Sequence, residues 1–211
     1  MLQRKIELLC ITCRRDDISY DEQVKLACEG GADMIQFRDK KMCDRELFET
    51  VVRLFEICKK YNVYFTINNR IDIADISNAD GVHLGQKDLP VSYARKILGQ
   101  EKIIGISASG IEKVLEADIL SADYIGTGAI FPTDTKPEAV VRGLEVLKEI
   151  KKRNITKPII AIGGINKDNV AEVIKAGADG VAVVSAVCGA ADIKKEAQVI
   201  KEIIKNAKNI F

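Results

Sequence analysis

Tryptophan is absent from the 211-residue chain, aromatic residues make up only 5%, and neither sign of charge is in excess. The 32 Lys and Arg residues balance 31 Asp and Glu residues, so the formal net charge is +1. Proteins that bind nucleic acids usually carry a basic surplus and often stack bases on aromatic side chains. The composition therefore argues against nucleic acid as a partner.

Long hydrophobic runs are also missing. No segment approaches the roughly 18 consecutive apolar residues of a transmembrane helix. Arg4, Lys5 and Glu7 interrupt the N-terminal stretch, which therefore lacks the apolar core of a signal peptide. We expect a cytoplasmic protein with no membrane partner. Because 47% of the residues are hydrophobic, the chain can bury a core.

Histidine is nearly absent, whereas cysteine is not. His83 is the only histidine, and the six cysteines are expected to be reduced thiols in the cytoplasm. Cys10 and Cys13 form a CxxC pair. A zinc site would need a second pair of ligands at similar spacing, which the sequence lacks. Packing at a strand end is the simpler interpretation of the pair, with a redox function as the alternative.

Short runs of β-branched residues alternate with amphipathic helical stretches along the whole chain. The runs are almost continuously apolar, as parallel strands covered on both faces are. Eight strand–helix units in this length predict a single (β/α)8 TIM barrel spanning residues 1–211, with a doubly wound sheet of fewer strands as the alternative. The expected strands are Ile6–Thr12, Met34–Arg38, Val63–Ile67, Gly81–Leu84, Ile103–Ser107, Tyr124–Thr127, Ile159–Ile162 and Gly180–Val184. The expected helices include Tyr20–Glu29, Arg45–Tyr61, Glu138–Lys152, Asp168–Ala176 and Ile193–Ala207.

An internal repeat supports closure of the barrel. Four of the expected strands are entered through a small residue followed by Ala-Asp. A Gly or Asn at the first position suits a helix end with positive φ, and the short Ala permits close packing of helix on strand. Such turns lie at the N-terminal face of a barrel, where they serve stability and not chemistry. The four copies are Gly31-Ala32-Asp33, Asn78-Ala79-Asp80, Ser121-Ala122-Asp123 and Gly177-Ala178-Asp179.

The loops that follow the strands should build the active site of a barrel. After the second strand, Gln36, Arg38 and Lys40 alternate onto one side if the strand persists, and they suit a polyanionic ligand with a hydrogen-bonding end. After the fourth strand, Asp88 is a candidate Mg²⁺ ligand or an ordinary helix N-cap. His83 lies within an apolar strand pattern, which favours a structural, hydrogen-bonded side chain over a catalytic base.

The last three loops also have the residues of phosphate sites. The loop after the sixth strand is long and carries Thr133, Thr135 and Lys136. Gly164 and Ser185 follow the seventh and eighth strands, where barrels often bind phosphate through backbone N–H groups. Two anionic ligands would therefore face one another across the barrel mouth. This arrangement predicts a transferase that joins two small phosphorylated substrates and releases pyrophosphate.

In these segments, and over nearly the whole chain, the sequence resembles the thiamine phosphate synthase family. Any one motif is weak, but seven in order are a specific signal. The matching segments are Gln36-Phe37-Arg38-Asp39-Lys40, Asn68-Asn69-Arg70, His83-Leu84-Gly85-Gln86-Lys87-Asp88, Gly105-Ile106-Ser107, Thr133-Asp134-Thr135-Lys136, Gly163-Gly164-Ile165 and Val184-Ser185.

The resemblance implies condensation of a hydroxymethylpyrimidine diphosphate with a thiazole phosphate by a dissociative mechanism with Mg²⁺. It implies catalytic roles for Lys136, Arg38 and Ser107. The pyrimidine diphosphate would be bound by the residues Gln36, Phe37, Arg38, Asp39, Lys40, Asn68, Ser107 and Lys136. The thiazole phosphate would be bound by Thr133, Asp134, Thr135, Gly164, Val184 and Ser185, and the metal by Asp88 and Asn69.

One position departs from the family pattern. The resemblance implies an Asp ligand where this chain has Asn69, so we expect Mg²⁺ to bind more weakly until the diphosphate adds its oxygens. Asp72 lies nearby as a less favoured substitute. Two other functions are left open: a related thiazole tautomerase, which would need a base, and a non-catalytic barrel that senses phosphate. The sequence also leaves open whether the protein forms a homo-oligomer.

Overall fold

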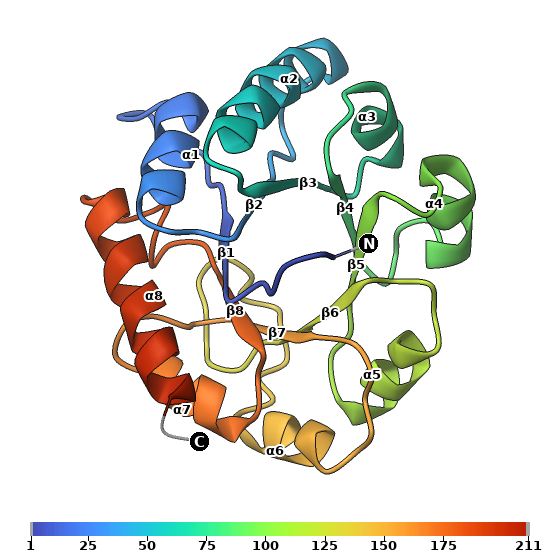
Figure 1. Ribbon diagram of the computed structural model, residues 1–211, viewed down its shortest axis with the longest axis vertical. Coiled ribbons are helices and arrows are strands. Elements are labelled where there is room, and N and C mark those ends of the chain that lie inside the picture. Colours follow the sequence, from blue (N-terminus) through green and yellow to red (C-terminus); the bar gives the residue numbers. More distant parts are fainter. Residues whose placement is uncertain (1, 210–211) are drawn as a thin grey trace.

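A computed structural model describes residues 2–209. Eight parallel strands close into a barrel in the order β1 to β8, with β1 pairing β8 through Cys10 and Val183. Figure 1 shows the eight helices as a ring around the strands. This confirms the predicted (β/α)8 architecture. The strands are β1 Leu8–Ile11, β2 Met34–Phe37, β3 Tyr64–Asn68, β4 Gly81–Leu84, β5 Ile103–Ser107, β6 Tyr124–Gly128, β7 Ile159–Ile162 and β8 Gly180–Val183.

Most of the predicted helices are confirmed to within one or two residues, and three further short ones complete the ring. The helices are α1 Tyr20–Glu29, α2 Asp44–Lys60, α3 Ile71–Ile76, α4 Val91–Leu98, α5 Ile111–Asp118, α6 Glu145–Lys151, α7 Val170–Ala176 and α8 Ile193–Lys208. None of the helices within residues 2–209 is long and apolar enough to cross a membrane.

The prediction of a helix over Glu138–Lys152 is wrong in its first half. Helix α6 begins only at Glu145, and the preceding segment belongs to a long loop. The backbone N–H groups of Arg142 and Gly143 donate to the carbonyls of Ala129 and Ile130, at 2.8 and 3.2 Å. These bonds close the base of the loop, and the segment is therefore held by the end of β6 and not by helical hydrogen bonds.

Two apolar layers hold the barrel together. The larger layer lies between strands and helices, and it includes Leu47, Val51, Leu54 and Cys58 of α2 as the helical spacing predicts. The smaller layer fills the barrel interior near the N-terminal ends of the strands, with side chains from alternate strand positions. Its members are Ile6, Leu9, Ile11, Met34, Ile103, Tyr124, Ile160 and Ala182.

The N-terminal segment covers one opening of the barrel. In Figure 1 it crosses in front of the strands before it enters β1. Ile6 is buried there, and the Arg4 guanidinium lies 4.4 Å from the centre of the Tyr64 ring. The predicted strand Ile6–Thr12 is therefore too long at its start, because residues 6 and 7 belong to this covering segment. The opposite opening is left for the site.

The four repeated aspartates have a common structural function. Each carboxylate accepts a hydrogen bond from a backbone N–H group at the first or second residue of the preceding odd-numbered strand. Asp33 accepts from Leu8, Asp80 from Phe65, Asp123 from Ile104 and Asp179 from Ile159, at 2.7–2.9 Å. The predicted stabilising function at the N-terminal face is thus confirmed. Positive φ occurs at Gly31, Asn78 and Gly177, whereas Ser121 is not among the positive-φ residues.

The cysteine pair near the end of β1 has the environment of packed side chains. Cys10 is fully buried and Cys13 is half-buried, and both are free thiols. Burial raises the pKa of both thiols, which disfavours the reactive thiolate form. The packing interpretation of Cys10 and Cys13 is therefore favoured over the redox one.

The Asp123 carboxylate gives a direct test of this strand-end support. It also pairs with Arg95 at 2.7 Å, and the two side chains are 13% and 9% exposed. Asp123→Ala should lower the free energy of unfolding by about 3 kcal/mol, because Arg95 would stay buried without its partner. Asp123→Asn should cost less, since it keeps an acceptor for the Ile104 N–H. Urea denaturation measures both.

The exposed Asp75 of α3 provides the control. Asp75→Ala should change stability by no more than about 0.5 kcal/mol. Equal losses for Asp123→Ala and Asp75→Ala would contradict the supporting function of the repeat.

Candidate active site

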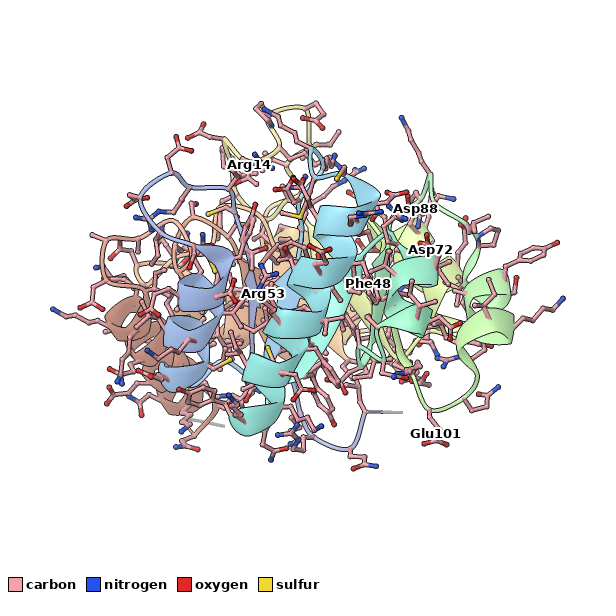
Figure 2. All side chains as sticks on the ribbon, turned by 90° about the horizontal axis from the view of Figure 1, so that it is seen from above. Arg14, Phe48, Arg53, Asp72, Asp88 and Glu101 are labelled. Carbon is pink, nitrogen blue, oxygen red and sulfur yellow. The ribbon has the colours of Figure 1, made fainter. Side chains whose placement is uncertain are left out.

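The carboxyl ends of the strands carry most of the polar residues selected from the sequence. Figure 2 shows Arg14 and Asp88, which follow β1 and β4, at one edge of the molecule, and Glu101, which precedes β5, at the opposite edge. The long loop between β6 and α6, yellow in both figures, lies at the same edge as Arg14 in Figure 2 and overlaps β7 and β8 in Figure 1. The barrel mouth is therefore bordered by loops from several strands.

Inward-facing strand positions change from apolar to polar toward this mouth. Met34 and Ile103 belong to the interior cluster, so residues two and four positions further along the same strands face inward as well. These positions are Gln36 on β2 and Ser107 on β5. By the same alternation Asn68 follows Tyr64 on β3, and Val184, just beyond β8, packs on the interior cluster. The structure thus brings together Gln36, Asn68, Ser107 and Val184.

A partly buried hydrogen-bonded chain joins the neighbouring strands β4, β5 and β6 below the mouth. The two ring nitrogens of His83 lie 2.9 Å from the Tyr124 hydroxyl and 2.8 Å from Ser107 Oγ. Burial lowers the pKa of His83 to about 4, so its imidazole is neutral at neutral pH. The sequence interpretation of His83 as a hydrogen-bonded structural residue is therefore favoured.

Tyr124 is the member of these hydrogen-bonded side chains that the sequence analysis missed. Its side chain is fully buried, and a Cβ atom at Gly105 would lie only 2.2 Å from its Cζ atom. Gly105 is also the register partner of Tyr124 across β5 and β6. A large residue flanked by glycines at inward-facing positions was the available signal, because glycine leaves room for a side chain that crosses the barrel.

The loop after β2 carries the basic residues of the first candidate anion site. Strand β2 ends at Phe37, so Arg38 and Lys40 lie in the loop and not on an extended strand edge. Arg38 is half-buried, and its backbone N–H donates to Thr12 Oγ1 at 3.0 Å. Lys40 is exposed. Both cations therefore stand at the mouth on a loop whose base is fixed.

Two neighbouring residues, Phe37 and Asp39, do not present their side chains to the mouth. Phe37 is buried in the layer beneath the helices, where it packs edge-on against the Tyr20 ring at 5.0 Å. The Asp39 carboxylate accepts hydrogen bonds from the Tyr20 hydroxyl at 2.7 Å and from Arg14 at 2.8 Å. It also accepts from the N–H of Lys41. These contacts keep the pKa of Asp39 below its usual value despite burial and make the residue an anchor of the loop.

The second candidate anion site lies on the loops after β6, β7 and β8. The N–H groups of Ile130 and Phe131 donate to the carbonyls of Ile162 and Gly163, which extends the β6–β7 pairing into both loops. A Cβ atom at Gly164 would lie 2.4 Å from the Pro132 carbonyl oxygen, and Gly164 has a φ of 63°. Only glycine fits there. This close packing holds Gly164 directly beside the start of the loop that carries Lys136.

The remaining residues selected for that site differ in exposure. Thr133 is half-buried and accepts a hydrogen bond from the Thr135 N–H at 3.3 Å. Asp134, Thr135 and Lys136 are exposed on the same loop, and Ser185 is exposed after β8. The hydroxyls, the ammonium group and the backbone around Gly164 therefore share the mouth, where an anion could bind to them.

The candidate metal ligands lie on neighbouring loops. Asp88 Oδ2 accepts a hydrogen bond from the Gly85 N–H at 2.6 Å, as in a turn. The Asn69 N–H donates to the His83 carbonyl at 2.9 Å, which holds the loop after β3 beside the end of β4. Both oxygens of Asp72 accept hydrogen bonds from Arg70, at 2.9 and 2.6 Å, and this ion pair makes Asp72 a less favourable metal ligand. Within residues 2–209 no group of three or more His, Cys, Asp or Glu side chains could hold a metal ion.

The closed barrel, the neutral polar side chains inside it and the cationic loops at one mouth are together typical of a TIM-barrel enzyme whose site lies at the carboxyl ends of the strands. A family model described as thiamine monophosphate synthase matches residues 8–187. The chain therefore belongs to the thiamine monophosphate synthase family, and it is an enzyme of the transferase class.

Individual relatives agree with this assignment. A thiamine-phosphate synthase of Persephonella marina is 48% identical over 183 residues, which cover 87% of each chain. A thiamine-phosphate synthase of Pyrococcus furiosus is 43% identical over 204 residues, 97% of each chain. The solved structure of a thiamine phosphate pyrophosphorylase from Pyrococcus furiosus superimposes with a TM-score of 0.88 at 42% identity, covering 96% of both chains.

The lowered pKa of His83 predicts a specific dependence of stability on pH. An imidazole whose pKa is about 4 in the folded protein and about 6.5 when unfolded does not oppose folding above pH 6.5. As the pH falls below that value, the unfolded state gains a proton that the folded state does not. We expect His83 to lower the free energy of unfolding by about 2 kcal/mol between pH 7 and pH 5.

Chemical denaturation at pH 7, 6 and 5 measures this slope. His83 is the only histidine in the chain, and it contacts no carboxylate or cation through its ring, so His83→Gln should remove most of the slope. An unchanged slope in this variant would show that another group is responsible.

Proposed function

We propose that the protein is a thiamine phosphate synthase that joins 4-amino-2-methyl-5-hydroxymethylpyrimidine diphosphate to 4-methyl-5-hydroxyethylthiazole phosphate and releases pyrophosphate. The observation that carries the proposal is the meeting of two cationic loops and a neutral polar layer at one end of a closed barrel. Family membership supports it.

The pyrimidine diphosphate would lie between the neutral layer and the loop after β2. Gln36 and Ser107 offer amide and hydroxyl groups to the ring, while Arg38, Lys40, Asn68 and Lys136 offer cations and an amide to the diphosphate. Asp39 serves this site indirectly, because its bonds to Tyr20 and Arg14 fix the loop that carries Arg38 and Lys40.

The thiazole phosphate would bind on the opposite side of the mouth. Thr133 and Thr135 offer hydroxyl groups, and the backbone around Gly164, Val184 and Ser185 can approach a phosphate closely. Asp134 would act through its place in the loop and not through its charge, since a carboxylate repels phosphate.

The reaction needs no nucleophilic side chain in this proposal. Diphosphate leaves first, the pyrimidine methylene becomes a cation stabilised by its ring, and the thiazole nitrogen attacks that carbon. Lys136, on the loop after β6, would stabilise the negative charge that develops on the diphosphate oxygen as the bond to the methylene carbon breaks. Cations fixed beside developing negative charge commonly supply several kcal/mol of transition-state stabilisation. Alignment of the two rings across the mouth supplies a further part.

The candidate ligands on the loops after β3 and β4 fit a magnesium ion that is held mainly by the oxygens of the diphosphate. Asp88 offers one carboxylate and Asn69 an amide oxygen, and Mg²⁺ characteristically completes such a site with phosphate oxygens and water. When bound, the ion would offset the charge of the diphosphate.

Pyrophosphate release in the presence of both substrates tests the proposal. Conversion of a thiazole carboxylate phosphate alone would instead identify a tautomerase, and no turnover with any of these compounds would favour a phosphate sensor.

With both substrates saturating, Lys136→Ala should lower kcat about 100-fold, because it removes one group that stabilises the departing charge. Lys175→Ala, at an exposed position of α7, is the control and should keep full activity. Unchanged turnover for Lys136→Ala would exclude its assigned function.

The Asn69 position gives a separate prediction about the metal. Asn69→Asp should lower the half-saturating Mg²⁺ concentration roughly fivefold or more, since one carboxylate beside the cation contributes at least about 1 kcal/mol. Calorimetric titration of Mg²⁺ into enzyme with inorganic pyrophosphate measures the same change without turnover. If both measurements match those of the unmodified enzyme, Asn69 does not contact the metal.

A further inference from the structure

We propose that Arg15, on the loop after β1, is a positioning residue for the candidate phosphate site at Ser185. Its neighbour Arg14 holds the loop after β2, on the opposite side of β1. The two arginines are adjacent in the sequence, yet their guanidinium groups bind loops that follow different strands. Only the assignment of each loop to one substrate rests on the proposed function, and the hydrogen bonds do not depend on it.

The loop after β1 starts from a fixed backbone. The Thr12 N–H donates to the Gln36 carbonyl at 3.1 Å, which continues the pairing of β1 with β2 beyond the end of β1. The buried Gln23 side chain of α1 binds both backbone groups of Cys13, accepting from its N–H at 3.4 Å and donating to its carbonyl at 3.0 Å. The residues directly before the two arginines are therefore held, so each arginine can bind its own loop independently.

Arg15 binds the loop after β8 through one end of its guanidinium group. Its Nη1 donates to the carbonyls of Cys188 and Ala190, at 3.1 and 2.6 Å. Its Nε and Nη2 donate to the Asp17 carboxylate, with Nε at 2.9 Å from Oδ1. The Arg15 side chain is only 19% exposed. A planar group bound at both ends holds its partners in one geometry, which the single ammonium group of a lysine cannot reproduce.

The segment that Arg15 binds packs directly on Ser185. Gly189 lies between the two acceptor carbonyls, and a Cβ atom there would lie 2.8 Å from Ser185 Cα and 2.9 Å from its carbonyl oxygen. The N–H groups of Val187 and Gly189 both donate to the Val184 carbonyl, at 3.3 and 3.4 Å. A shift of residues 188–190 would therefore displace the backbone at residues 184 and 185, which we expect to approach a phosphate.

Arg14 makes the corresponding contact with the loop after β2. Its Nη2 and Nε lie 2.8 and 3.1 Å from Asp39 Oδ2. The other carboxylate oxygen of Asp39 accepts from the N–H groups of Lys41 and Met42, at 2.7 and 3.1 Å. Because the Asp39 side chain is only 2% exposed, it depends on such partners. Arg14 thus supports the loop that carries Lys40, whereas Arg15 supports residues 184–190.

This division predicts that each arginine affects one substrate. Backbone N–H groups bind an anion well only where the backbone is held in place. Loss of Arg15 should weaken binding of the thiazole phosphate, and loss of Arg14 should weaken binding of the pyrimidine diphosphate. Arg15 acts through the backbone of Ser185 and makes no contact with the substrate, since its donors are directed at Asp17 and two carbonyls.

Amide hydrogen exchange followed by NMR tests the positioning function without any substrate. In Arg15→Ala we expect the N–H groups of Val187 and Gly189 to exchange about tenfold faster or more, while those of Lys41 and Met42 keep their rates. Arg14→Ala should give the reverse. Rates in both variants equal to those of the unmodified protein, or a rise in both segments in each variant, would overturn the inference.

Steady-state kinetics tests the consequence for binding. Arg15→Ala should raise KM for the thiazole phosphate about tenfold and leave KM for the pyrimidine diphosphate within about twofold. Arg14→Ala should show the opposite pattern. Arg15→Lys keeps the charge but not the planar fork, so we expect KM for the thiazole phosphate to rise about fivefold or more. An unchanged KM in Arg15→Lys would assign the effect to charge and overturn the positioning function.

Arg153→Ala is the matched control, because Arg153 forms an exposed ion pair with Glu149 of α6 at 3.5 Å. It should change neither KM value and neither set of exchange rates. A general loss of stability would raise both KM values alike, and that result for Arg15→Ala would contradict the assignment. Absence of turnover in the unmodified protein, with the exchange pattern present, would refute the proposed function and leave the support of the two loops by Arg14 and Arg15 standing.

Discussion

Carboxylates at the start of the even-numbered strands set the geometry on which the barrel mouth depends. Backbone N–H groups at the beginning of β1, β3, β5 and β7 donate to Asp33, Asp80, Asp123 and Asp179 at 2.7–2.9 Å. Each aspartate joins one pair of strands. Because strand registers determine which residues meet at the far end, these bonds also determine where the site residues lie.

Stability and chemistry are separated along the barrel axis. The N-terminal end combines the aspartates, the buried Arg95 and the covering N-terminal segment, and the interior there is apolar. Above this region the inward-facing residues become neutral hydrogen-bonding groups, and the cations stand only on the loops. A charged group inside the barrel would be costly to bury, so the structure carries neutral polar groups inside and ions at the rim.

The architecture was predictable from the sequence because the alternation of apolar strands and amphipathic helices repeats eight times and leaves few other topologies. The location of the site followed from the strand ends. The directions of individual side chains were harder to predict from the sequence. Phe37 and Asp39 lie in a motif that resembles the family pattern, yet Phe37 faces the helices and Asp39 faces Tyr20. The contacts of Tyr124 were hidden as well, because a tyrosine in an apolar strand has the same pattern as a core residue. These details depend on partners far away in the sequence, such as His83 for Tyr124 and Tyr20 for Asp39.

Gly164 limits how the loops after β6 and β7 can change in sequence independently of one another. Its missing side chain allows the Pro132 carbonyl of the neighbouring loop to lie where a Cβ atom would be, at 2.4 Å. The conformations of the two loops are therefore coupled by this contact. A chimera that exchanges the loop after β6 between distant relatives should retain the barrel but lose the fit at Gly164, unless the loop after β7 is transplanted with it.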